Sequence, residues 1–294
     1  MNYILCNIGN LPNYLEECIN TIMSSDKDAD IYLISDKDVK IKKVNTLNIN
    51  NFHDLIIQKD KLIDYYKDTN FSSDKYPLFY SSLLRVHMLN KASEIFNINE
   101  FVHFDNDVLI YHPFEKIKNL LTKDSVNITR VSSKDLVFGY SYFPSKELVS
   151  KLVDNIDRII DSNETYSNLY YRGGPLNEMR ILGIINKEIE GFFNILPSLP
   201  YFSVNNLIFD PSSYGQFLNG LHHRRGNYFI KRRWVSPTQE IGREITSKRI
   251  EVEFKNQKPY IIFQNSKYEL SNLHIHSKNL KKFLPNNYKK YTQI

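Results

Sequence analysis

Short apolar runs alternate with mixed polar and apolar segments along the chain, and the beginning shows the pattern most clearly. The apolar run at 3–8 predicts a strand, turn residues follow at 9–12, and a helix is expected from about 14 to 23. A second apolar run at 31–34 predicts another strand. Strand, helix and strand at this spacing are typical of a βαβ unit, so the pattern favours an α/β fold with a parallel sheet.

The rest of the chain repeats this alternation. The remaining helices are expected at about 54–66, 76–96, 115–121, 146–162 and 178–190. The remaining single strands are expected at 44–49, 101–111, 125–131, 136–143 and 201–209. Near the end, 250–254 and 260–263 alternate as a hairpin across the turn residues 256–259.

Within the run at 101–111, the aromatic and apolar residues at 101–104 are followed by two carboxylates separated by one residue, Asp105 and Asp107. In an extended chain, side chains repeat every two residues, so these two share a face and Asn106 points to the other. Two hard oxygen ligands suit Mg2+ or Mn2+ when a substrate diphosphate and water complete the shell. The alternative is a polar strand end at which Asp107 caps the following turn.

The first two predicted strands also end in polar residues. In parallel sheets ligands lie beyond the carboxyl ends of the strands, which places residues 7–10 and Asp36 where a nucleotide would lie. Asp36 is then a candidate for a hydrogen bond to the base or ribose. The alternative is a strand-end carboxylate that only caps a turn.

Two charged residues occur in helices at unusual places. Arg85 lies among apolar neighbours, which is costly unless a phosphate or one of the two aspartates pairs with it; the alternative is a surface arginine at the polar edge of its helix. Glu178 follows a Gly-Gly-Pro stretch at a helix start, where it is either a ligand-facing residue or a first-turn acid favoured by the helix dipole.

Two histidines and a lysine lie close together near the C-terminus. If this stretch is extended, His274 and His276 share a face, and a neutral imidazole near two carboxylates is a candidate metal ligand. Lys278 could neutralise a diphosphate as a point charge. The alternative is that both histidines are ordinary polar residues.

Composition indicates a globular protein with a mild positive charge. The 294 residues include 41% hydrophobic residues, the net charge is +5 and the pI is about 8.9. This charge suits an anionic small molecule or a phosphate and is below that of a dedicated nucleic-acid-binding protein. The segment 222–234 alternates cations and aromatic residues, which fits either a phosphate or nucleic-acid contact or a solvated loop.

Cysteine content and hydropathy indicate the compartment. Cys6 and Cys18 are expected to be reduced core residues. The N-terminus lacks the basic region and the long apolar run of a signal peptide, and no apolar segment is long enough to span a membrane. We therefore expect a soluble, cytoplasmic protein without an integral membrane segment.

Taken together, the motifs resemble the metal-dependent glycosyltransferases of GT-A fold, especially the galactosyltransferase and glycogenin-like group and small capsule-type and viral sugar transferases. The resemblance rests on short motifs in a characteristic order: the βαβ start at 3–36, Arg85 in its helix, Phe104-Asp105-Asn106-Asp107, Asn177-Glu178 and His276-Ser277-Lys278. It implies a Rossmann-like, mixed but mainly parallel sheet flanked by helices. It also implies a single domain over 1–294, with a nucleotide-sugar-binding half at 1–111 and an acceptor-side half at 112–294.

The resemblance also implies roles for individual residues. Asp105 contacts the ribose or the metal, Asp107 binds the metal and His276 completes the coordination, while Lys278 holds the diphosphate and Arg85 contacts the donor. The lysine follows His276 more closely than in glycogenin-like proteins, so His274 stays open as the ligand. The other expected donor contacts come from the sheet edge: Asn7, Ile8, Asp36 and Asn106.

The implied activity is transfer of a sugar from a nucleotide-diphosphate sugar, UDP-sugar favoured, to a glycan or other hydroxyl acceptor, with Mn2+ or Mg2+ as cofactor. Such a transfer needs stabilisation of the departing diphosphate. Inversion requires a carboxylate base on the acceptor, for which Glu178 is the first candidate and Asp210 the reserve. Retention requires front-face attack or a covalent intermediate, and we favour retention. No nucleic-acid partner is expected.

Two other functions compete with this one. Residues 105–109 also fit the D-x-D-x-T/V signature of haloacid-dehalogenase-type phosphatases. In those enzymes the strand normally opens the fold, whereas here about 100 residues precede it, and the later acidic motif is missing. The second competitor is a non-catalytic basic module for phosphate or nucleic acid, built on 222–234.

Overall fold

A seven-stranded sheet forms the centre of the molecule in this computed structural model, which describes residues 1–67, 69, 77–218 and 240–293. Its strand order is β3-β2-β1-β4-β7-β6-β8. The strands are β1 (Asn2–Asn7), β2 (Asp30–Ser35), β3 (Asn45–Asn48), β4 (Phe101–His103), β6 (Val126–Arg130), β7 (Leu136–Phe143) and β8 (Phe193–Ile195). Only β7 runs antiparallel to its neighbours, so the predicted mixed, mainly parallel sheet is confirmed.

The direction of β7 determines where the other strands end. Because β7 is antiparallel to both β4 and β6, the remaining six strands all point the same way. Their carboxyl ends therefore meet at one edge of the sheet, which we call the carboxyl edge. Ligand sites of α/β sheets form at such an edge.

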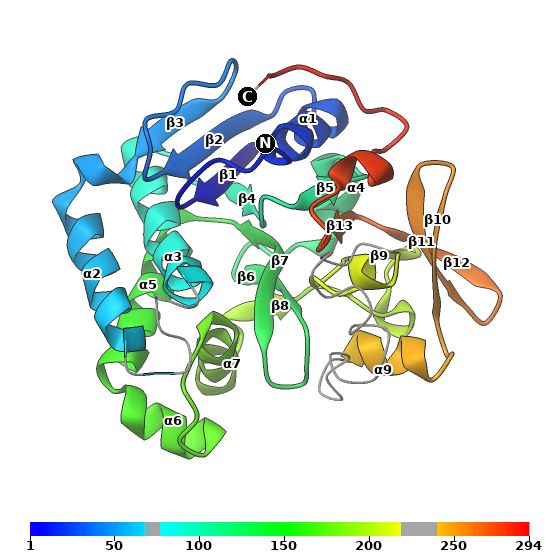
Figure 1. Cartoon of the computed structure of the whole chain (residues 1–294). Helices are drawn as coiled ribbons and strands as arrows, with labels where there is room; N and C mark the ends of the chain where they lie inside the picture. The colour runs from blue at the N-terminus through cyan, green and yellow to red at the C-terminus, as the bar shows by residue number, and fades with distance from the viewer. Residues whose placement is uncertain (68, 70–76, 219–239, 294) are drawn as a thin grey trace.

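Helices cover both faces of the sheet (Figure 1). The α-helices among the described residues are α1 (Leu15–Ser25), α2 (His53–Lys67), α3 (Pro77–Ile95), α4 (Phe114–Ile117), α5 (Lys146–Asp161), α6 (Asn163–Tyr171), α7 (Glu178–Glu188) and α9 (Glu240–Thr246), of which α6 and α9 lie away from the central sheet. Alternation along β1 assigns its residues to two cores, since Tyr3 and Leu5 pack with α1 whereas Ile4 packs with α3, α5 and α7. None of the described helices is long and apolar enough to cross a membrane.

Two smaller sheets lie beside the large one. One is four-stranded, β10-β11-β12-β9, with β9 (Leu207–Ile208), β10 (Glu251–Lys255), β11 (Lys258–Phe263) and β12 (Ser266–Leu270). The other pairs β5 (Val108–Ile110) with β13 (Asn272–His274). The predicted hairpin is confirmed as β10 and β11, but its turn is only Asn256-Gln257, both with positive φ as type I′ turns require.

Two expectations from the sequence are corrected. The run 101–111 is two strands in different sheets, because the chain turns between His103 and Val108. The region 201–209 is mostly not a strand: it holds the end of the 3₁₀ helix η3 (Pro200–Phe202) and the two residues of β9. Its apolar character instead reflects burial of the residues from Leu207 to Phe209. The strands β8 and β12 and the helices α6 and α9 were not predicted.

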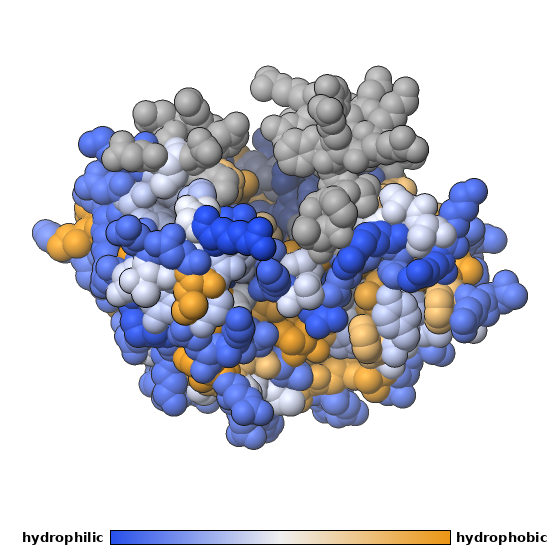
Figure 2. Space-filling model, turned by 90° about the horizontal axis from the view of Figure 1, so that it is seen from below, coloured by the Kyte–Doolittle hydropathy of each residue, from blue (hydrophilic) through white to orange (hydrophobic). Residues whose placement is uncertain are grey.

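Figure 2 shows one face on which hydrophobic residues form separate patches among hydrophilic ones. Three of the exposed large hydrophobic residues are close in sequence: Tyr201, Phe202 and Val204. The basic segment 222–234 lies outside the described residues.

A buried histidine links the end of β5 to the four-stranded sheet. His112 Nε2 lies 2.8 Å from Glu269 Oε2, and Lys116 Nζ lies 2.7 Å from the same oxygen. Burial, followed by the charge of Lys116, lowers the pKa of His112 to about 4, although Glu269 opposes the shift. The neutral imidazole is therefore the form that the folded protein accommodates.

This pKa predicts a loss of stability on acidification. The unfolded chain binds the His112 proton below its ordinary pKa of about 6.5, whereas the folded state resists it down to about 4, so stability falls as the pH drops through this window. Between pH 7 and pH 5 we expect His112 to account for roughly 2 kcal/mol of unfolding free energy. Urea unfolding of the wild-type protein and of His112→Asn, each at pH 7 and pH 5, measures this contribution to the unfolding free energy. An equal pH dependence in both proteins would contradict it.

Candidate metal and donor site

The turn that follows β4 presents the two aspartates at the carboxyl edge. Val108 N donates to Asp105 O at 3.1 Å, which closes the turn. Asp105 and Asp107 therefore converge through a turn, and the predicted extended geometry is wrong. Asn106 points away from them, and its Nδ2 donates to Cys6 O at 2.9 Å, joining the turn to the end of β1.

The strand β13 brings a histidine to these carboxylates. Because β13 pairs with β5, His274 stands opposite Val108, next to Asp107. His274 Nε2 lies 2.9 Å from Asp107 Oδ2, and its Nδ1 lies 3.8 Å from Asp105 Oδ2. One potential ligand atom from each of the three residues lies within 4.8 Å of the others. We call Asp105, Asp107 and His274 the acidic cluster.

His276 lies behind this cluster. Its ring stacks on His274, with centroids 4.4 Å apart and planes at 18°. Its Nε2 lies 2.9 Å from Ser212 O and 3.2 Å from Gln216 Nε2. Burial, followed by the charge of His274, lowers the pKa of His276 to about 3. Of the two histidines that the sequence left open, the cluster contains His274, whereas the resemblance implied His276.

Positive charge surrounds the carboxylates. Lys278 contacts Asp107 and also lies over the ring of Tyr14, with Nζ 5.5 Å from the centroid. Burial opposes ionisation of Asp107, but His274 and Lys278 outweigh it and hold the pKa of Asp107 far below its usual range. Burial also opposes the charge of His274, but Asp107 and Asp105 raise its pKa. The carboxylates are therefore ionised at neutral pH.

Arg85 connects the cluster to the second half of the chain. Its guanidinium contacts Asp105, and its NH2 lies 2.7 Å and 2.6 Å from the two carboxylate oxygens of Glu178. Burial works against the arginine charge, but Glu178 and Asp105 outweigh it and raise the pKa of Arg85. Of the two interpretations of Arg85 from the sequence, the structure therefore matches an arginine paired with an aspartate and not a surface arginine.

Glu178 is the first residue of α7, where Asn177 caps the helix by accepting from Arg180 N at 3.1 Å. Its side chain is buried, and both of its oxygens accept from Arg85. Burial raises the pKa of Glu178, and the contact with Arg85 opposes that shift. The Glu178 carboxylate is therefore held inside the protein by its ion pair with Arg85.

Asp210 is enclosed by the protein and accepts a hydrogen bond from the backbone of His274, a member of the acidic cluster. It is fully buried and accepts from the backbone N–H groups of Ser213, Tyr214 and His274 at 2.6, 2.9 and 3.0 Å. Burial raises its pKa, and these hydrogen bonds oppose the shift. Its contacts hold the backbone of His274 in place, and its expected reserve role as a base stays a prediction.

Sequence reasoning missed one supporting residue, Gly215. A Cβ atom at this position would lie 1.9 Å from His274 O, so no side chain fits between this turn and β13. Its only signal in the sequence is a glycine between Tyr214 and Gln216, which by itself indicates a turn and nothing about a site.

The residues expected to contact a nucleotide lie together at the carboxyl edge. Asn7 is the last residue of β1, and Asn106 Nδ2 donates to its Oδ1 at 3.4 Å. Asp36 Oδ1 accepts from Gly9 N at 2.8 Å, so this carboxylate does cap the turn that includes Ile8. The structure thus joins Asn7, Ile8 and Asp36 to the turn of the two aspartates, and their role toward a nucleotide stays a prediction.

The acidic cluster fits a divalent cation. Two carboxylates and an imidazole form an oxygen-rich donor set of the kind that binds such ions. The Nδ1 atom of His274 is buried and has no hydrogen-bond partner among the described residues. A buried polar atom in this state is costly, and a nearby cation or ligand oxygen would relieve the cost.

Comparisons with known proteins give structural but not sequence matches. No protein-family model matches the sequence, and no curated protein does so either. The chain is similar to the crystal structure of mouse xyloside xylosyltransferase 1, with 13% identity, a TM-score of 0.45, and coverage of 67% of this chain and 86% of that one. For galactosyltransferase LgtC with donor and acceptor sugar analogs, the identity is 10%, the TM-score 0.45 and the coverages 67% and 73%.

A third similar structure is the glycosyltransferase GlyE of Streptococcus pneumoniae. Its identity is 10%, its TM-score is 0.41, and the match covers 66% of this chain and 44% of that one. All three structures are of glycosyltransferases.

Proposed function

We propose that this protein is a metal-dependent glycosyltransferase that moves a sugar from a nucleotide-diphosphate sugar, UDP-sugar favoured, to a hydroxyl group of a glycan or other acceptor. The observation that carries the proposal is the convergence of Asp105, Asp107 and His274 at the carboxyl edge of a mainly parallel sheet. Three protein ligands leave about half of an octahedral shell open, and diphosphate oxygens and water can fill it.

Each charged residue has a role in this proposal. Asp105, Asp107 and His274 would hold Mn2+ or Mg2+, which supplies positive charge to the leaving diphosphate when bound. Lys278 adds a second positive charge beside Asp107. Arg85 fixes Asp105 and contacts the donor. The nucleotide is expected along the adjacent strand ends, with contacts from Asn7, Ile8, Asp36 and Asn106.

The surroundings of the two candidate bases support retention of configuration. Inversion needs a free carboxylate to take the acceptor proton, but Glu178 is engaged by Arg85 and Asp210 by backbone N–H groups. In front-face attack the bond between the sugar C1 and the diphosphate oxygen breaks while C1 bonds to the acceptor oxygen on the same face. The acceptor proton goes to the departing phosphate oxygen, so no protein base is required. Glu178 is then a positioning residue for Arg85.

The competing functions gain no support from the described residues. In the phosphatases the D-x-D strand opens the fold, whereas here β4 follows β1, β2 and β3. The basic segment 222–234, on which the binding module would depend, lies outside the described residues.

Substituting the two C-terminal histidines separately tests the composition of the site. His274→Gln is expected to weaken Mn2+ binding and donor turnover by roughly a hundredfold, because it removes a ligand that faces both aspartates. His276→Gln is the matched control, and we expect changes within about threefold, since its Nε2 faces Ser212 and Gln216. Mn2+ titration followed by electron paramagnetic resonance gives the affinity, and release of nucleoside diphosphate gives turnover.

The opposite order of effects would move the ligand role to His276. Unchanged affinity and turnover in both variants would remove β13 from the proposed site altogether.

A further inference from the structure

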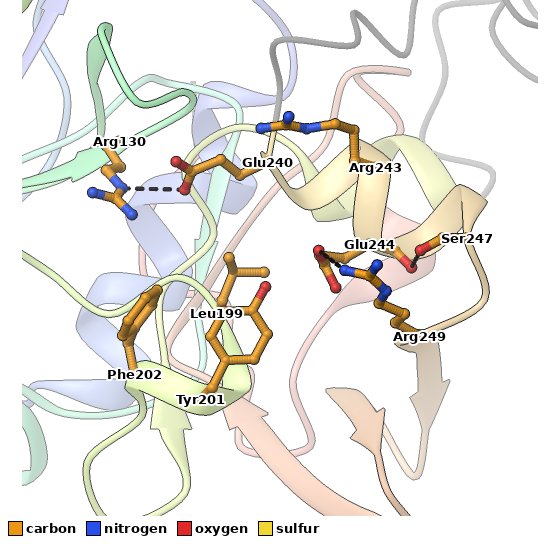
Figure 3. A pocket seen from close by; sticks show the side chains of 9 residues that line it. All are labelled: Arg130, Leu199, Tyr201, Phe202, Glu240, Arg243, Glu244, Ser247 and Arg249. Carbon is orange, nitrogen blue, oxygen red and sulfur yellow. Dashed lines mark hydrogen bonds and ion pairs between the residues drawn. The ribbon is translucent and has the colours of Figure 1, made fainter.

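A pocket of about 470 Å³ opens beside the end of β6 (Figure 3). Its walls come from β6, the 3₁₀ helix η3 and α9, segments that are far apart in the sequence. In the figure, Arg130 and Phe202 lie on one side, Glu244 and Arg249 on the other, and Tyr201 between them. The volume is within the range of ~300–1,000 Å³ that small-molecule sites occupy.

This pocket lies at the same sheet edge as the acidic cluster. Arg130 is the last residue of β6, and η3 follows shortly after β8, so the pocket forms where those two strands end. In the sheet, β6 is two strands from β4, which corresponds to roughly 10 Å. The strands that lead to the acidic cluster and to the pocket are therefore separated by one strand of the sheet, β7.

Hydrogen bonds also connect the two places. Tyr214 donates its hydroxyl to Ser198 O at 2.6 Å, and Phe209 N donates to Pro197 O at 2.8 Å. The segment before η3 is thus held against the turn that supports His274 through Asp210. The pocket and the acidic cluster therefore share one scaffold.

Two aromatic rings form the floor of the pocket. Tyr201 and Phe202 are 47% and 55% exposed, with ring centroids 5.0 Å apart and planes at 72°. Phe263 supports Tyr201 at 5.8 Å, and the Arg130 guanidinium lies 5.8 Å from the Phe202 centroid. Exposed aromatic residues held in a fixed orientation are typical of binding surfaces. The apolar C–H faces of sugar rings are suitable partners for them.

The polar walls of the pocket consist of two arginine–glutamate ion pairs. Arg130 Nε lies 3.1 Å from Glu240 Oε2, and Arg249 NH1 lies 3.2 Å from Glu244 Oε1. The side chains of Glu240 and Glu244 are only 15% and 14% exposed, so their orientations are restricted. Neighbouring donors and acceptors of this kind match the adjacent hydroxyl groups of a sugar.

The charge of the lining favours a neutral ligand. Among the residues that the structure describes, the lining includes Arg243 and has three arginines and two glutamates, which leaves a single net positive charge. A polyphosphate or nucleic acid would require more positive charge than this. An aromatic floor with charge-balanced polar walls instead suits a carbohydrate.

We propose that this pocket binds a sugar unit of a neutral oligosaccharide acceptor, with Tyr201 and Phe202 stacking on the ring and Glu240 and Glu244 accepting from its hydroxyl groups. The inference rests on the proposed glycosyl transfer, because the acidic cluster would hold the donor. It adds that the acceptor is a glycan of at least two sugars, of which one lies in the pocket while another presents its hydroxyl to the donor.

Saturation-transfer NMR tests this inference on the full chain. The probes are the linear hexaoses of glucose, galactose, mannose, xylose and N-acetylglucosamine, and inorganic tripolyphosphate is the anionic comparison. At least one hexaose is expected to bind the wild-type protein, and Tyr201→Ala/Phe202→Ala is expected to weaken it by roughly tenfold or more. Leu169→Ala is the matched control, since Leu169 is exposed on α6 away from the pocket.

A second variant and a donor measurement make the outcome decisive. Glu244→Gln keeps both rings and should weaken the same hexaose by about fivefold, which covers the case in which the double variant fails to fold. Two outcomes would overturn only the pocket inference. In the first, the wild-type protein binds a nucleotide sugar with Mn2+ but binds no hexaose. In the second, it binds tripolyphosphate in this pocket instead of a hexaose. Failure of donor binding overturns the proposed function. Equal hexaose affinity in wild type and variants also overturns the pocket assignment.

Discussion

Asp107→Asn is expected to reduce turnover of the donor by about a thousandfold or more, because the loss of a metal ligand removes several kcal/mol of stabilisation from the departing diphosphate. Asp107 is 3% exposed and faces both His274 and Lys278. The substitution replaces a negatively charged oxygen ligand by a neutral amide, so Mn2+ affinity should fall together with turnover. Release of nucleoside diphosphate and direct Mn2+ titration measure the two effects.

An exposed aspartate provides the control for this prediction. Asp38 accepts from Asn48 Nδ2 at 2.7 Å and lies outside the cluster, so Asp38→Asn should leave Mn2+ affinity unchanged. Full activity and unchanged Mn2+ affinity in Asp107→Asn would show that the D-x-D turn is not a metal site.

Arg85→Met is expected to lower the unfolding free energy by about 3–5 kcal/mol, because it leaves the buried carboxylate of Glu178 without its partner. Glu178→Gln is expected to be destabilising as well, since it leaves the guanidinium of Arg85 with Asp105 alone. The double variant Arg85→Met/Glu178→Gln should be less destabilised than the sum of the two single variants, because it removes both charges. Urea unfolding of all four proteins gives the coupling energy.

The same variants distinguish a positioning role from a base role for Glu178. If Glu178 positions Arg85, Glu178→Gln should reduce donor affinity as well as turnover, because Asp105 loses its fixed partner. If Glu178 is the acceptor base, the variant should keep donor affinity and stability while only turnover falls. That second pattern would contradict the retaining mechanism proposed above.

The sequence predicted the elements that rest on strong apolar periodicity. The first βαβ unit was expected within two residues of its observed bounds, as were α5 and β7. Such segments bury one face along their whole length, so their pattern survives in the sequence alone. Local reasoning also predicted that Arg85 pairs with a phosphate or with one of the two aspartates, since a guanidinium among apolar residues needs a counter-charge, and Arg85 contacts Asp105.

The parts that could not be predicted depend on contacts between distant segments. Choosing His274 over His276 requires the register of β13 against β5, which places His274 opposite Val108. The hydrogen bonds that Asp210 accepts from the N–H groups of Ser213, Tyr214 and His274 also leave no signal in its local sequence. The pocket beside Tyr201 likewise exists only because three separate segments meet there.

Donor binding with and without metal is the most direct test of the central claim. Thermal unfolding would be measured with UDP-, GDP-, CMP- and dTDP-sugars, each with Mn2+ and with a chelator. A ligand near a hundred times its dissociation constant stabilises the folded state by about 2.7 kcal/mol, which corresponds to a shift of several degrees. We expect a UDP-sugar to raise the melting temperature only when Mn2+ is present. No shift with any nucleotide sugar, or the same shift in chelator, would contradict it.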